Sequence, residues 1–66
     1  MVLTKQILNS LDQKGIVDKH TLYLEIDDPQ IPDQLAFLCE RKYIKQISVN
    51  AFAITEKGKM TLFKLL

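Results

Sequence analysis

The first stretch with a clear hydrophobic pattern covers residues 3–13. Four apolar residues recur there at helical spacing: Leu3, Ile7, Leu8 and Leu11. On a helix of 3.6 residues per turn they share one face, so this stretch predicts an amphipathic helix. Gly15 follows, and glycine is favoured just beyond a helix because it adopts a positive φ readily. The sequence therefore predicts a helix over 3–13 that ends at Gly15.

The second stretch, residues 19–26, is compatible with two kinds of element. Asp18 is suited to cap a helix start, and Leu22 and Ile26 lie four residues apart, with Tyr23 beside them. Leu24 between them also creates an alternation of period two, which is typical of a strand. Both readings stay open from the pattern alone.

The third stretch, residues 31–44, changes period within two residues. Ile31, Leu35 and Leu38 share one helical face, and Cys39 lies at its edge. The helix begins either at Pro32 or at Pro29, the latter with Asp28 as its cap. Residues 43–49 are then rich in β-branched and aromatic residues and predict a strand, followed by a short turn at 49–51 and a second strand at 52–54. Asn50 in this turn tolerates a positive φ.

The last stretch predicts a C-terminal helix. Thr55 is a suitable cap, and Gly58 permits close approach to a neighbouring element. Apolar residues are unusually frequent after it: Leu62, Phe63 and Leu66 form a stripe, which Met60 and Leu65 widen. This exceeds what one small core needs, and it favours a homodimer formed through the terminal helices.

The order of these elements resembles the second half of a winged helix-turn-helix domain, as in MarR-type and PadR-type regulators. The end of the family's recognition helix is matched by Leu35, Leu38, Tyr43 and Ile44, and the end of its wing by Ile54, Thr55 and Gly58. The resemblance implies an α+β fold with three helices, a short two-stranded wing and a C-terminal helix. It also implies that residues 19–26 are helical.

Lys42 departs from the family pattern, which has glycine after the recognition helix. Glycine is favoured there because the residue after a helix often has a positive φ. Another residue in that conformation costs about 1 kcal/mol. Either Lys42 accepts this cost or the helix ends in another way.

Length and composition predict one globular domain over residues 1–66. Apolar residues make up 47% and charged residues 26%, which argues against disorder. The single cysteine cannot form an internal disulfide, and no signal peptide is recognisable, so we expect a reducing, cytoplasmic setting. No apolar run approaches the length of a membrane span.

Few residues are available for catalysis, so we expect that the protein is not an enzyme and binds no cofactor. His20 is the only histidine and has no cysteine or second histidine at metal-ligand spacing. Cys39 borders an apolar face, which favours a structural thiol over a nucleophile. The two glycines do not form a phosphate-binding loop.

Charge is distributed unevenly although the net charge is only +1. Residues 1–33 carry three lysines and six acids, whereas residues 34–66 carry six bases and two acids. A basic half of this kind points to an anionic partner. With the resemblance, it predicts that double-stranded DNA is contacted by Gln30, Gln34, Phe37, Arg41, Lys42, Lys45 and Lys57.

The sequence thus supports two hypotheses. The first is a non-enzymatic DNA-binding regulator, in which Gln30, Gln34 and Phe37 approach bases while the cations hold phosphates. The second is a winged helix that binds another protein through the face around Phe37. It is favoured by the low net charge, by Asp33 and Glu40 on the same helix, and by a wing tip without Arg or Lys.

Overall fold

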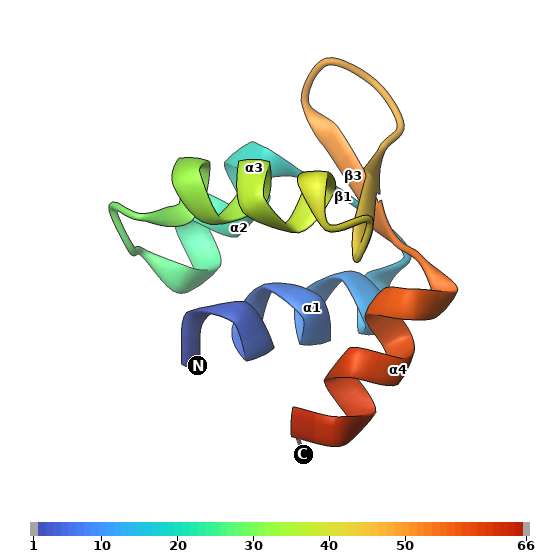
Figure 1. Ribbon diagram of the computed structural model, residues 1–66. Coiled ribbons are helices and arrows are strands. Elements are labelled where there is room, and N and C mark those ends of the chain that lie inside the picture. The colour runs from blue at the N-terminus through green and yellow to red at the C-terminus, as the bar shows by residue number, and fades with distance from the viewer. Residues whose placement is uncertain (1, 66) are drawn as a thin grey trace.

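The computed structural model describes residues 2–65, which form four helices and a three-stranded antiparallel sheet (Figure 1). In chain order the elements are α1 (Val2–Lys14), β1 (Ile16–Asp18), α2 (Lys19–Ile26), α3 (Ile31–Glu40), β2 (Ile44–Gln46), β3 (Ala51–Ile54) and α4 (Glu56–Leu65). The predicted α+β class is therefore confirmed.

The ends of α1 and α2 follow the predicted local chemistry. Gly15 has φ of 86°, and its N–H donates to the Leu11 carbonyl at 2.8 Å. The Asp18 carboxylate accepts the N–H of His20 at 2.7 Å and so caps α2. Residues 19–26 are helical, so the strand alternative for this stretch is wrong.

The turn between α2 and α3 differs from the prediction. Gln30, not Asp28, is the residue at the N-terminal boundary of α3, and Pro32 lies in the first helical turn. The Asp28 carboxylate instead accepts the N–H of Gln30 at 2.8 Å, while the Asp28 carbonyl accepts the N–H of Ile31 at 3.2 Å. Asp28 therefore shapes the turn, and the helix start at Pro29 is wrong.

Lys42 does adopt the conformation that normally favours glycine, with φ of 64°. Its N–H donates to the Cys39 carbonyl and the N–H of Tyr43 donates to the Leu38 carbonyl, each at 3.0 Å. These two bonds define a Schellman motif at the end of α3. The steric cost of a positive φ at Lys42 is therefore present in the fold, and the chain turns directly from α3 toward β2.

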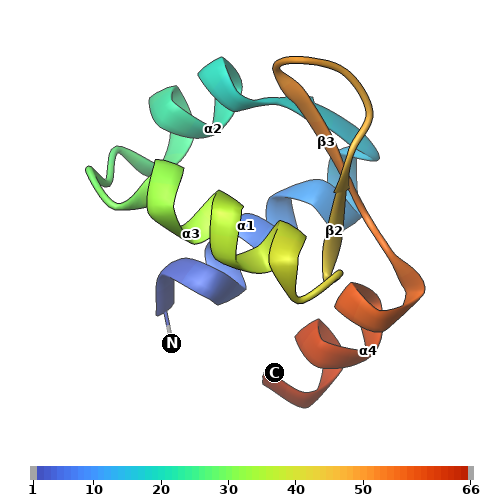
Figure 2. The same cartoon turned by 45° about the horizontal axis from the view of Figure 1, so that its top comes forward.

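The sheet has one strand more than the sequence predicted. Its strand order is β1-β3-β2, and Figure 2 shows β2 beside β3. Val17 lies opposite Phe52, and Lys45 lies opposite Ala53. Only three residues long, β1 is too short to produce a recognisable alternation. The predicted hairpin is therefore the larger part of a three-stranded sheet.

The loop between β2 and β3 is longer than predicted. Strand β2 ends at Gln46, not at residue 49, and residues 47–50 connect it to β3. Asn50 has no positive φ; its carbonyl accepts the N–H of Lys19 at 2.7 Å, which ties the loop to the start of α2. The loop tip carries no charged side chain, as the sequence indicated.

The hydrophobic core surrounds α1, which contacts the other three helices and strands β1 and β3. Its buried apolar residues are Ile7, Leu8, Leu11, Val17, Leu22, Ile31, Leu35, Leu38, Ile44, Phe52 and Leu62. The predicted inner faces of α1 and α3 are confirmed, except that Leu3 is only partly buried.

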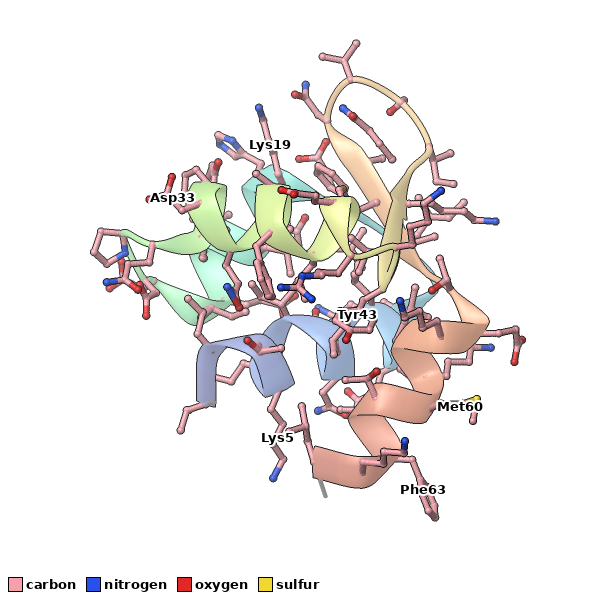
Figure 3. All side chains as sticks on the ribbon, viewed as in Figure 1. Lys5, Lys19, Asp33, Tyr43, Met60 and Phe63 are labelled. Atoms are coloured by element: carbon pink, nitrogen blue, oxygen red, sulfur yellow. The ribbon has the colours of Figure 1, made fainter. Side chains whose placement is uncertain are left out.

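Helix α4 packs on α1, and its apolar residues exceed what the core takes up, as predicted. Leu62 is buried, whereas Phe63 is 80% exposed and projects from the fold with Met60 (Figure 3). Leu66 lies outside the described residues. Gly58 permits close packing, because a Cβ there would lie 2.7 Å from Cγ1 of Ile54 and would also clash with the Tyr43 carbonyl.

Candidate functional site

The side of α3 opposite the core is acidic. Ile31, Leu35 and Leu38 face inward, so the helical period turns Asp33, Phe37 and Glu40 outward. All three are exposed, and 42% of Phe37 is accessible to solvent. Two carboxylates on this ridge would repel phosphates that came close to it.

One flank of α3 faces α1 and carries four of the predicted contact residues. They recur every turn of the helix, in the order Gln30, Gln34, Phe37 and Arg41. Gln34 is half-buried, and its side-chain oxygen accepts the hydroxyl of Thr4 on α1. The Arg41 guanidinium carbon lies 5.1 Å from the centre of the Phe37 ring, within the range of a cation–π contact. These residues thus make contacts within the protein as well as facing solvent.

The opposite flank of α3 faces the hairpin and borders a basic groove. Two open hollows, of about 260 and 400 Å³, form this groove and share Cys39 and Gln46 in their walls. Lys19 lines the first hollow, whereas Lys42 and Lys45 line the second. Among the described residues, no Asp or Glu lines either hollow. We call this feature the hairpin groove; it is the one part of the α3 surface where cations gather without acids.

The floor of the hairpin groove is small and apolar. Pro32, Ala36 and Cys39 supply the side of α3, and Phe52 supplies the side of β3. Burial raises the pKa of the Cys39 thiol, because the apolar surroundings disfavour the thiolate. A neutral thiol beside apolar side chains can pack against a ligand but is poorly activated for nucleophilic chemistry.

Lys57 lies outside the hairpin groove. Its ammonium nitrogen is 5.1 Å from the centre of the Tyr43 ring, at the junction between α4 and the end of α3. Thr55 holds this junction together: its N–H donates to the Tyr43 carbonyl at 3.1 Å, and its hydroxyl lies 2.7 Å from the Lys42 carbonyl. The seven predicted contact residues therefore divide among the α1 flank, the hairpin groove and this junction.

Charge separates more sharply along the observed elements than between the two halves of the sequence. Residues 18–41, which comprise α2, α3 and their flanking caps, carry six acids and two bases, a net charge of −4. Residues 42–66 carry five bases and one acid, a net charge of +4. The hairpin groove lies where the basic segment meets α3.

Sequence reasoning missed Lys19 and Gln46. The Asp18 cap already implies that Lys19 is the first residue of α2, so the sequence contained a signal for its position. Its proximity to the hairpin follows only from the tertiary contact between Lys19 and Asn50. Gln46 could not be assigned to a face of the sheet because the strand register was unknown.

The structure indicates no metal site within residues 2–65, since no three His, Cys, Asp or Glu side chains there are grouped to hold an ion. His20 is exposed, and its ring centre lies 6.5 Å from that of Tyr23. No helix formed by these residues has the length and apolar character that crossing a membrane requires.

The chain matches no protein-family model, and comparisons with curated proteins and with solved structures find no significant match. Function is therefore inferred from the chain's own geometry and charge.

Proposed function

We propose that this chain is a winged helix-turn-helix module that binds double-stranded DNA along the hairpin groove. The order of elements supports the fold: a four-residue turn joins α2 to α3, and α3 leads into the β2–β3 hairpin and then α4. So short a turn between two helices is typical of the helix-turn-helix arrangement, whose second helix enters the major groove of DNA.

The basic hairpin groove is the observation that carries the DNA proposal. Lys19, Lys42 and Lys45 line its two hollows and no Asp or Glu does, so the groove offers cationic side chains to phosphate oxygens. Lys19 occupies the first turn of α2, where the helix dipole disfavours a cation.

In the proposed complex, α3 approaches the major groove with its hairpin flank. Ala36 is exposed and small enough to contact a thymine methyl group. Asp33 and Glu40 then face base edges, where a carboxylate accepts from the cytosine amino group. This orientation gives Lys19 and Lys42 the main phosphate contacts and reduces the roles predicted for Gln34 and Lys57.

The test is a titration with random-sequence duplex DNA at several salt concentrations. Three phosphate contacts predict a slope of log K against log salt of about −2.7 per module. Lys42→Gln keeps the backbone conformation but removes one charge, so we expect weaker binding and a slope flatter by about 0.9. Lys19→Gln has the same expected effect, with a melting temperature that is unchanged or slightly higher because an unfavourable dipole interaction is lost.

The matched control is Lys5→Gln, since Lys5 lies on the far side of α1 from α3 (Figure 3). It removes the same charge and should leave the slope unchanged. Absence of DNA binding at low salt, or equal effects of the Lys5 and Lys42 substitutions, would contradict the proposed groove.

A second candidate function is protein binding through the acidic ridge. The Phe37 ring is exposed and lies under the Arg41 guanidinium, between Asp33 and Glu40 on the helix surface. Aromatic and arginine side chains contribute most of the binding energy in many interfaces. This reading predicts that Phe37→Ala abolishes capture of a partner while the melting temperature changes little. It becomes the better explanation if the wild-type chain fails to bind DNA at low salt.

A further inference from the structure

The outer face of the sheet is left uncovered by the four helices. Val17, Ile44 and Phe52 point inward to the core. The strand register therefore turns the alternate residues outward: Ile16 and Asp18 on β1, Ala51 and Ala53 on β3, and Lys45 on β2. Ile47 continues this row, because its N–H donates to the Ala51 carbonyl at 2.8 Å. We call these six residues the outer sheet face.

The outer sheet face has apolar residues on one diagonal and opposite charges on the other. Ile16 is 61% exposed and Ile47 is 46% exposed, at opposite corners. Asp18 and Lys45 occupy the remaining corners, and both are exposed. Ala51 and Ala53 lie in the centre, where their short side chains permit close approach of another surface. From standard strand geometry the face measures about 7 Å along the strands and about 10 Å across them.

We propose that the outer sheet face binds the same face of a second copy of this chain, about a two-fold axis along the Ile16–Ile47 diagonal. This rotation places Ile16 against Ile16 of the second copy and Ile47 against its counterpart. It also brings each Asp18 to about 4 Å from the position opposite Lys45 of the other copy, within the reach of the lysine side chain. The face is therefore complementary to itself in both hydrophobicity and charge, as an isologous interface requires.

The same rotation fixes how the two sheets cross. The diagonal lies at about 55° to the strands, from the dimensions above, so the strands of the two sheets cross at about 70°. This is close to the orthogonal class of sheet packing. A hollow of about 300 Å³ opens beside Ile16, Lys45 and Ile47 and offers space for the partner's isoleucine side chains. Asp12 of α1 and Lys59 of α4 also line it, and their charges are opposite.

Helix α4 offers a poorer surface for a symmetric dimer, despite its exposed Met60 and Phe63. Two antiparallel copies of α4 that place Met60 opposite Phe63 also place Lys59 opposite Lys64. Like charges in direct opposition disfavour association. The outer sheet face avoids this repulsion, so the proposed homodimer differs from one formed through the terminal helices.

Because six positions make a small interface, we expect a weak dimer that forms in a concentration-dependent way. The proposal does not depend on DNA binding, and it is tested by sedimentation equilibrium of the full chain without DNA. Ile16→Ser should raise the dimer dissociation constant about tenfold or more. Phe63→Ser, which removes an exposed apolar side chain from α4, should leave it unchanged. A chain that stays monomeric at its highest soluble concentration overturns the proposal, as does an equal loss of dimer in both variants.

The charged corners permit a sharper test with two charge variants. Lys45→Glu makes both corners acidic and Asp18→Lys makes both basic, so each variant alone should be monomeric. A mixture of the two should form a heterodimer, because each acidic corner then meets a basic one. Asp18→Lys also removes the α2 cap, so its fold is checked by circular dichroism, and Asp18→Asn, which keeps a capping side chain, should weaken the homodimer only partly. Failure of the mixture to associate while both variants are folded overturns the proposed pairing.

Discussion

The effect of the Lys42 backbone conformation on stability can be separated from the effect of its side-chain charge. Its φ of 64° carries a steric cost that glycine would avoid. Lys42→Gly and Lys42→Ala both remove the lysine charge, but only alanine keeps a Cβ, which is strained at this φ. We therefore expect the free energy of unfolding of Lys42→Gly to exceed that of Lys42→Ala by about 1 kcal/mol. Urea denaturation of the two variants measures the difference. Equal stabilities would show that the Schellman bonds do not hold residue 42 in this conformation in solution.

Cys39 provides a pH-dependent test of burial. Its pKa is raised because burial disfavours the thiolate. The unfolded chain therefore releases the thiol proton first as pH rises, and the free energy of unfolding falls once pH passes the ordinary thiol value of about 8.5. Below that value this contribution is fully retained. We expect the fall in wild type to exceed that in Cys39→Ala when urea denaturation is compared on the two sides of this pH.

At the scale of elements, Thr55 joins α4 to the end of α3. Its hydroxyl accepts the N–H of Gly58 at 3.0 Å and lies within hydrogen-bond distance of the Lys42 and Tyr43 carbonyls. Thr55→Val preserves the shape but removes these bonds, and we expect a loss of about 1–2 kcal/mol in the free energy of unfolding. Thr61→Val is the control.

The Thr61 hydroxyl bonds only the Lys57 carbonyl within the same helix, and this bond is exposed. Its loss should change stability by much less than the loss of the Thr55 hydroxyl. Comparable melting temperatures for the two valine variants would show that the Thr55 contacts do not stabilise the junction.

Elements with a sustained period were predictable from the sequence, whereas short ones were not. The faces of α1 and α3 follow from spacings that repeat over several turns, and the caps at Asp18 and Thr55 follow from local chemistry. Strand β1 has three residues, and its identity depends on Phe52 and Ala53 far along the chain. A local pattern cannot contain that information.

At the scale of the whole molecule, the sequence predicted which residues of α3 lie outside the core, but not which other residues lie beside them. The spacing of Gln34 and Phe37 indicated a non-core face, yet only the tertiary structure shows Thr4 beside Gln34 and the hairpin beside Ala36. Likewise, the sequence revealed a charge asymmetry, but the hairpin groove arises only when Lys19 and Lys42 are brought to one flank of α3. A surface assembled from distant segments depends on packing that no single segment specifies.

The pairing of β1 with β3 also has a consequence for the order in which the chain folds. Ile16 pairs with Ala53, which lies 37 positions further along the chain, so this pairing closes a long loop. By contrast, the hydrogen bonds of α1, α2 and α3 form within single helical turns. Closing so long a loop is entropically costly before the core has formed. We therefore expect the three helices to collapse first and the central strand to dock last. Substitutions in α1 would then slow refolding, while substitutions in β1 would mainly accelerate unfolding.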